Sequence, residues 1–280
     1  MKKYFCWIFL LFLAGVMLAG FHNQLTLTEY RISNSRIPAG FDGYRMAVVT
    51  DLHAERFGEK QQELISLLRG SECDLICLLG DMVSHDTTDF SPVWELIDAM
   101  AGIPMVYVAG NNELSLEDYA LFLSGLSSRS VTVLDDMTQC TLTLTSGADS
   151  ILIHGYPFTD SRLLGDRLPL ADSGLYNILL YHDPYCFHEA ALKDYDLMLS
   201  GHIHGGVIRF PLIGSPLEWM GLEPFTKGVY TSRAATMVVS GGLGDHDTLP
   251  RFFNDAEVVL ITLDATENKY RKNDTVREAQ

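Results

Sequence analysis

The feature that most constrains the fold of this chain is a series of short apolar runs, each followed by side chains that can bind a metal ion. The runs are four to six residues long, and segments with helical periodicity lie between several of them. They are RMAVVT before Asp51-Leu52-His53, DLICLL before Gly80-Asp81, MVYVA before Gly110-Asn111-Asn112-Glu113, YNILLY before His182-Asp183, and DLML before Ser200-Gly201-His202-Ile203-His204. Because sites collect outside the carboxyl ends of strands in open α/β sheets, this pattern predicts one site built from five strand ends.

Each of these residues also has an ordinary alternative role. Asp51 and Asp81 could be turn residues, which are common after strands. Asn111 after Gly110 has the form of a plain turn, and a lone His182 at a strand end is more often a hydrogen-bonded polar residue than a ligand. Five such coincidences at equivalent positions would be needed, so we interpret the set as a metal site.

The ligand types indicate which metals the site would hold. Imidazole suits zinc and iron, whereas carboxylate and carbonyl oxygens favour manganese and other hard ions. A mixed set without thiolate therefore predicts Mn²⁺, Fe or Zn²⁺. One carboxylate can bridge two ions about 3.5–4 Å apart, and such a pair clamps the attacking and leaving oxygens of an in-line displacement and generates hydroxide at neutral pH.

Composition limits the partners of such a site. The formal net charge of −16 argues against a nucleic-acid-binding surface, which normally appears as a basic patch. The same charge would repel phosphate substrates, but bound divalent cations can reverse it locally. The five cysteines show no Cys-x-x-Cys spacing and lie in or beside apolar runs, which favours buried thiols over disulfides or a zinc ribbon.

The order of the expected elements indicates an α/β fold with two stacked sheets and helices on their outer faces. Leu25–Ile32 alternates apolar and polar residues, which predicts an edge strand. Between Ser130 and His154 the expected strands leave no room for helices. The expected helices are Glu59–Arg69, Val93–Met100, Leu116–Ser124 with Ser115 as N-cap, and a segment around His188–Lys193, and the last expected strands are Val207–Phe210, Val229–Thr231, Thr236–Val239 and Val258–Leu263.

The N-terminal segment has the pattern of a targeting signal. Lys2 and Lys3 precede the uncharged stretch Tyr4–Phe21, whose 18 residues would span roughly 27 Å as a helix, enough to cross a hydrocarbon core. A cleaved signal peptide is the alternative, but the stretch ends in a poor cleavage site. We therefore expect an uncleaved transmembrane helix with the lysines inside the cell, although Arg31 and Arg36 weaken this orientation.

These segments divide the chain into three expected parts. Residues 1–24 form the membrane segment, residues 25–265 form one globular domain, and residues 266–280 form a polar tail that frays from about Asn268. The expected location is the cell membrane, with a single span and the catalytic domain outside the cytoplasm.

In their order along the chain, the motifs resemble the calcineurin-like metallophosphoesterase superfamily, and most closely its YkuE-like branch of membrane-associated bacterial phosphoesterases. The resemblance is carried by Asp51-x-His53, Gly80-Asp81, Gly110-Asn111, His182, Gly201-His202-x-His204, Ser200–Pro211, and Gly241-Gly242-Leu243-Gly244 with Arg251-Phe252. It covers roughly Leu25 to Leu263. It implies a four-layer α/β/β/α sandwich, here preceded by the transmembrane helix.

The resemblance also implies a role for each matching residue. The implied ligands are Asp51, His53 and His204 for one ion, Asn111, His182 and His202 for the other, and Asp81 as the bridge. The implied catalytic residues are Asp81, Asn112 and His204. Gly205 and Gly206 would let the backbone pass close to the site, although a plain turn is their simpler role.

One position departs from the family pattern, which usually reads Gly-Asn-His followed by Asp or Glu. The histidine is thought to help stabilise or protonate the leaving group, and here it is Asn112. An amide can donate a hydrogen bond but cannot deliver a proton, and general acid catalysis contributes about 10²–10⁴-fold. We therefore expect activity biased toward good leaving groups, such as a phosphate in a pyrophosphate bond. His85, His154 and His246 are candidate substitutes, but structural or surface roles are the simpler interpretation.

Two hypotheses follow for the function. The first is a phosphohydrolase that acts at the membrane surface on a phosphorylated small molecule or lipid, and the N-terminal segment motivates the lipid. The second is a catalytically weak scaffold or sensor that binds metal or phosphate, and Asn112 motivates it. The complete ligand set favours the first, whereas fold likeness alone does not identify the substrate.

Overall fold

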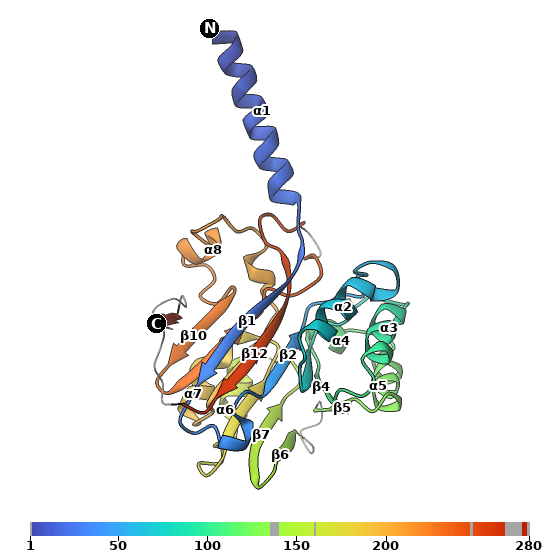
Figure 1. The fold of residues 1–280 in the computed structure, drawn as a ribbon, viewed down its shortest axis with the longest axis vertical. Coiled ribbons are helices and arrows are strands. Elements are labelled where there is room, and N and C mark those ends of the chain that lie inside the picture. Colours follow the sequence, from blue (N-terminus) through green and yellow to red (C-terminus); the bar gives the residue numbers. More distant parts are fainter. Residues whose placement is uncertain (1, 135–139, 160, 247–248, 267–275, 279–280) are drawn as a thin grey trace.

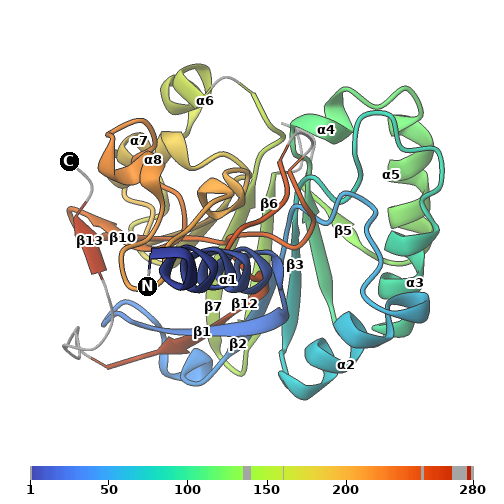
Figure 2. The same cartoon turned by 90° about the horizontal axis from the view of Figure 1, so that it is seen from above.

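The computed structural model describes residues 2–134, 140–159, 161–246, 249–266 and 276–278. Its strands form two mixed sheets with helices on both outer sides (Figures 1 and 2). The first sheet has the order β1 (Leu25–Ser33), β12 (Ala256–Asp264), β2 (Arg45–Val49), β3 (Leu75–Leu79), β4 (Met105–Val108) and β5 (Thr132–Val133). The second has the order β13 (Val276–Glu278), β10 (Gly228–Ser232), β11 (Ala235–Val239), β9 (Leu197–Ser200), β8 (Tyr176–Leu180), β7 (Asp149–Gly155) and β6 (Thr141–Ser146).

Helices cover the outer face of each sheet. α2, α3 and α5 pack on the first sheet, and α6 and α7 pack on the second. The α-helices are α1 (Lys2–Phe21), α2 (Gln62–Gly70), α3 (Ser91–Ala99), α4 (Asn111–Leu114), α5 (Tyr119–Ser128), α6 (Ser161–Arg167), α7 (Phe187–Leu192) and α8 (Pro216–Trp219). The short 3₁₀ helices are η1 (Ala39–Phe41), η2 (Glu59–Gln61), η3 (Pro184–Cys186) and η4 (His204–Gly206). The layers therefore follow the order helix, sheet, sheet, helix, as expected.

The strands next to the site are apolar on both faces because both faces are covered. In β2, Ala47 and Val49 point to the core under α2 and α3, whereas Met46 and Val48 point to the core between the sheets. This alternation is the period of two of a strand, and all four side chains are buried. Burial on both faces explains why RMAVVT is a continuous apolar run.

The site and the base of α1 lie at the same edge of the fold. β2, β3 and β4 run parallel, so their carboxyl ends share one edge of the first sheet. β12 runs antiparallel to β2 and parallel to β1, so the start of β1 at Leu25 lies at that edge too. Since α1 ends at Phe21, it rises from the edge that carries the strand-end motifs, as Figure 1 shows.

The expectations for the two chain ends were a transmembrane helix at the N-terminus and a frayed polar tail at the C-terminus. Within the described residues no helix meets both the length and the hydropathy that crossing a membrane demands, so the predicted transmembrane helix is not supported. In the predicted frayed tail, Val276–Glu278 pair with β10 as β13, and most of its other residues lie outside the described ranges. The division into three parts stays a prediction.

Two predicted elements in the interior differ from the structure. The predicted strand Val207–Phe210 is wrong, because Val207 has a φ of +60° and only isolated bridges form at Ile208 and Phe210. The helix predicted from Leu116 begins at Tyr119, and Ser115 is not its N-cap but follows the unpredicted α4. Both errors arise in segments that follow the site motifs.

Candidate metal centre

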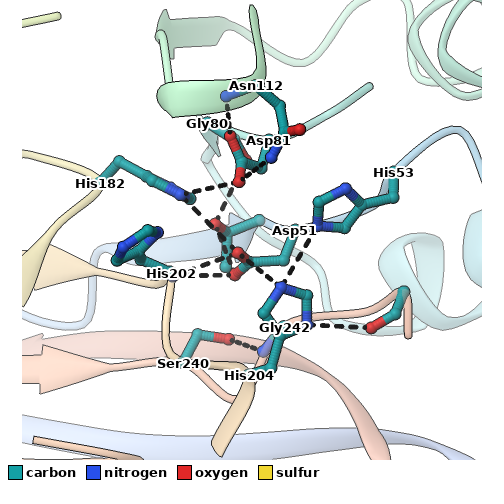
Figure 3. A network of polar contacts seen from close by, with 12 residues as sticks. Asp51, His53, Gly80, Asp81, Asn112, His182, His202, His204, Ser240 and Gly242 are labelled. Carbon is teal, nitrogen blue, oxygen red and sulfur yellow. Dashed lines mark hydrogen bonds and ion pairs between the residues drawn. The ribbon is translucent and has the colours of Figure 1, made fainter. Parts of the chain in front are cut away.

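Six of the seven side chains predicted to bind metal lie together at the carboxyl ends of β2, β3, β8 and β9 (Figure 3). The seventh, Asn111, follows β4 at the same edge of the first sheet. Asp51 is at the centre, with His53 and His204 on one side and His182 and His202 on the other. Two groups of side chains each bring three ligand atoms within 4.8 Å of one another: Asp51, His53 and His204, and Asp81, His182 and His202. The first group has the three residues that the resemblance implied for one ion. The second has His182 and His202 of the set implied for the other ion, together with Asp81, the implied bridge, and it does not include Asn111.

The backbone is held in a sparsely populated conformation at most of these residues. The φ angle is positive at five of them: Asp51 (+52°), His53 (+51°), Asp81 (+50°), His202 (+75°) and His204 (+47°). The left-handed region costs an L-residue roughly 1–2 kcal/mol. Such strain persists only where surrounding contacts enforce it, and it clusters at functional sites.

Three of the four imidazoles are fixed by a hydrogen bond at the ring nitrogen that faces away from the site. His182 Nδ1 lies 2.8 Å from Leu79 O, and His204 Nδ1 lies 3.2 Å from Gly244 O. His53 Nδ1 lies 3.0 Å from Ser84 Oγ. Each bond leaves Nε2 directed into the site, which is the arrangement that orients histidines for metal binding.

Two buried polar atoms of the predicted ligands make no hydrogen bond among the described residues: Asn111 Oδ1 and His182 Nε2. Buried polar atoms are nearly always satisfied, so Asn111 Oδ1 calls for an explanation such as a bound ion. His182 Nε2 faces carboxylate oxygens instead, at 3.3 Å from Asp81 Oδ2 and 3.8 Å from Asp51 Oδ1, between the two groups. The donor set therefore fits divalent cations.

Charges at the site are tightly coupled. Burial alone would lower the pKa of His182, but Asp81 and Asp51 outweigh it and raise the pKa to about 10. Burial would raise the pKa of Asp81, but His182 holds it well below its usual range. Burial lowers the pKa of His204 to about 4. In the metal-free protein at neutral pH, His182 is therefore the cation that balances the two carboxylates, while His204 is neutral.

Asn112, which stands where the family has histidine, is engaged on both sides of its amide. Its Nδ2 donates to Asp81 Oδ2 at 2.7 Å, and its backbone N–H donates to Asp81 Oδ1 at 2.9 Å. Its Oδ1 accepts from the backbone N–H of His85 at 3.1 Å. The side chain therefore holds the carboxylate that is assigned as the bridge.

Of the three histidines considered as substitutes, one lies away from the centre. His154 is buried, and its two ring nitrogens lie 3.0 Å from Thr141 Oγ1 and 3.1 Å from Asn177 Oδ1, which is a structural role. The ring of His246 lies 5.4 Å from that of His204. His85 is exposed and contacts Asn112 through its backbone.

Glu113 is a part of the site that the sequence analysis did not single out, although it belongs to the Gly110-Asn111-Asn112-Glu113 motif. Its fully buried carboxylate accepts from the backbone N–H groups of Asp81 (2.9 Å), Met82 (2.6 Å) and Gly110 (3.0 Å). Burial, with Asp81 nearby, raises the pKa of Glu113 to about 8. Glu113 thus ties the loop after β3 to the loop after β4.

Comparisons with known proteins all indicate the same family. Residues 44–206 match the model of the calcineurin-like phosphoesterases. The uncharacterised metallophosphoesterase YkuE of Bacillus subtilis is 30% identical over 264 residues, which cover 87% of each chain. The phosphodiesterase YaeI of Escherichia coli is 28% identical over 68% of this chain and 74% of its own. Another uncharacterised metallophosphoesterase of B. subtilis, YkoQ, is 27% identical over 70% of this chain and 74% of its own.

Proposed function

The chain belongs to the calcineurin-like phosphoesterase family, in its YkuE-like branch, and is a metal-dependent phosphoester hydrolase; we propose that it cleaves phosphate ester or pyrophosphate bonds with good leaving groups at a membrane surface. The observation that carries the catalytic part is the pair of ligand groups around Asp51 and Asp81. Both carboxylates are buried and each lies beside histidines whose Nε2 atoms point inward.

The family implies two divalent ions, and we assign Mn²⁺, Fe or Zn²⁺ to the two groups. Asp51, His53 and His204 would hold one ion, Asn111, His182 and His202 the other, and Asp81 would bridge them. Ions bound there would supply Lewis-acid charge stabilisation and acidify a water molecule. The chain's own part is to hold the ligands: Ser84, Leu79 O and Gly244 O orient three imidazoles, and Asn112 and Glu113 fix the loop of Asp81.

The test of the catalytic proposal is hydrolysis of an activated aryl phosphate in the presence of Mn²⁺, Fe²⁺ or Zn²⁺. An Asp81→Asn variant is the control, because it removes the proposed bridging charge while keeping the shape of the side chain. We expect wild-type turnover with at least one metal, and faster turnover of diesters and pyrophosphates with acidic leaving groups than of alkyl phosphates. Turnover no greater than that of the Asp81→Asn variant with every metal would defeat the proposal.

The membrane part of the proposal rests on α1. Its exposed side chains include Trp7, Leu11, Phe12 and Leu18, each at least 66% exposed, and large exposed apolar patches mark protein or membrane contacts. α1 rises from the edge of the fold that carries the metal centre (Figure 1). A membrane surface that contacts α1 would therefore face the centre, which favours a lipid-linked phosphate as substrate.

Vesicle flotation tests the membrane part separately. We expect the full chain, but not a variant that lacks residues 2–18, to float with phosphatidylcholine vesicles. Both forms should hydrolyse a soluble aryl phosphate at similar rates, because the deletion leaves every proposed ligand in place and keeps Gly20 and Phe21, which contact Phe253 and Phe252 beside the centre. Equal flotation of the two forms, or none by either, would contradict contact through α1.

Asn112 favours a second candidate, a scaffold that binds metal or phosphate without efficient turnover. An Asn112→His variant separates the two candidates. If Asn112 marks a lost activity, the variant gains from near zero by about the 10²–10⁴-fold that general acid catalysis supplies. If the chain is adapted to good leaving groups, we expect a small change with activated substrates.

A further inference from the structure

The loop that carries His204 has a backbone conformation that requires outside support. Four consecutive residues have positive φ: His204 (+47°), Gly205 (+62°), Gly206 (+76°) and Val207 (+60°). Glycine adopts this region freely, but for a β-branched residue such as Val207 it is a genuine outlier. The ψ of −56° at Val207 makes it the strained form of the γ-turn. The position of His204 therefore depends on contacts from elsewhere in the chain.

The support comes from residues 251–254, the segment Arg251-Phe252-Phe253-Asn254, here called the RFFN segment. Asn254 is 1% exposed, and its Nδ2 donates to His204 O at 2.8 Å and to Val207 O at 3.3 Å. The backbone N–H of Phe252 also donates to Val207 O, at 3.2 Å. A Cβ at Gly205 would lie only 2.7 Å from Asn254 Oδ1, so the loop fits closely against the segment.

Arg251 supports the side chain of His204 rather than its backbone. It is 2% exposed, and its Nε and Nη2 donate to the carbonyl of Gly244 at 2.9 and 2.6 Å. The same carbonyl lies 3.2 Å from His204 Nδ1 and accepts its proton. Arg251 thereby fixes the oxygen that sets the ring orientation of His204. The guanidinium of Arg251 and a bound metal ion would both be cations and would repel each other. Attraction to a metal ion is therefore not the reason that Arg251 is buried here.

We propose that Asn254 and Arg251 are positioning residues for one half of the metal centre, the half formed by Asp51, His53 and His204. Asn254 holds the left-handed backbone of His204, and Arg251 holds the carbonyl that receives the proton of its Nδ1. Partners of ligating histidines typically change metal affinity by about 10–100-fold when mutated. The inference rests on the proposed function, since it assigns a role relative to the ions proposed there.

The test compares Mn²⁺ binding by metal-free wild type, Asn254→Leu and Arg251→Lys, followed by calorimetric titration and by electron paramagnetic resonance. Leucine keeps the branched arrangement of heavy atoms of Asn254 without its donors, and lysine keeps the charge of Arg251 without its forked contact. Asn177→Leu is the matched control. Asn177 is also fully buried and donates from Nδ2 to two backbone carbonyls, those of Asp172 and Leu175, at the opposite end of β8.

We expect wild type and Asn177→Leu to bind two Mn²⁺ ions that give the spectrum of a coupled pair. The Asn254→Leu and Arg251→Lys variants should bind one ion as wild type does and the other about 10–100-fold more weakly, with the spectrum of isolated Mn²⁺ at low metal. Wild-type affinity for both ions in the variants, or equal weakening at both, would overturn the inference. If Asn254→Leu does not fold, Arg251→Lys decides alone. Failure of wild type to bind two ions would instead overturn the proposed function.

Discussion

A single methyl group at Gly242 should displace Asp51, one of the proposed metal ligands. Gly242 has a φ of +70°, and a Cβ built on it would lie 2.7 Å from both Cβ and Oδ2 of Asp51. Contacts below 3.0 Å do not persist, so Asp51 must move by several tenths of an ångström in Gly242→Ala. Asp51 is fully buried and forms the centre of one ligand group, so it has no free space to move into without leaving that group.

The magnitude of this effect separates into a backbone part and a site part. An alanine at positive φ costs roughly 1–2 kcal/mol, and each kcal/mol lowers the melting temperature of a domain of this size by about 2–4 °C. Displacement of Asp51 should further weaken Mn²⁺ binding to its group by about 10–100-fold, the range found when the support of a ligand is lost. Hydrolysis of an aryl phosphate should fall in parallel at limiting metal.

Gly147→Ala is the control that isolates the site part. Gly147 has a φ of +62°, but a Cβ there would meet no atom within 4 Å, and the residue lies in the hairpin between β6 and β7. We expect both variants to melt a few degrees below wild type, and only Gly242→Ala to lose metal affinity, as measured by calorimetric titration. Wild-type affinity in Gly242→Ala, or an equal loss in Gly147→Ala, would refute the argument from close packing on Asp51.

Four further outcomes follow from the same geometry. Because Asp81 raises the pKa of His182 to about 10, metal binding must displace the proton of His182. Calorimetry in buffers of different ionisation enthalpy should therefore show proton release, and Mn²⁺ affinity should rise about tenfold per pH unit below pH 10. The same protonated pair stabilises the metal-free fold fully below the ordinary histidine pKa of about 6.5 and loses that contribution as pH rises toward 10, so the melting temperature without metal should fall across this window. Ser84→Ala frees His53 Nδ1 and should weaken one Mn²⁺ site by about tenfold, whereas both sites would weaken if Ser84 acted through general stability. Metal at about 100 times its dissociation constant should raise the melting temperature by roughly 5–10 °C, and EDTA should reverse the gain.

The location of the site could be predicted from the sequence because the geometry of parallel strands is simple. The strands β2, β3 and β4 are parallel neighbours, so residues directly after them must share one edge of the sheet. Apolar runs that are followed by Asp51, Asp81 and Asn111 therefore predict that these three residues lie at one edge of the sheet. The family resemblance supplied the remaining step, the division of the ligands into two groups.

The contacts that hold the ligands could not be predicted in the same way. Glu113 binds backbone N–H groups of two loops, and Asn254 binds backbone carbonyls of a third, and neither interaction leaves a periodic pattern. The left-handed backbone at Val207 also has no sequence signal, since valine ordinarily favours strands, and the strand predicted there was wrong for this reason. Tertiary contacts determine how closely these loops pack, and in the sequence only the glycines indicate that the loops approach one another closely.

The structure also gives a physical account of the substitution of histidine by Asn112. Its amide nitrogen donates one hydrogen bond to Asp81 Oδ2, and its amide oxygen accepts one from the backbone N–H of His85. Neither N–H of the amide can deliver a proton to a leaving oxygen. Asn112 therefore holds Asp81 and does not replace histidine as a general acid. An enzyme built this way depends on leaving groups that depart without a proton, which is the class of substrate that the proposed function names.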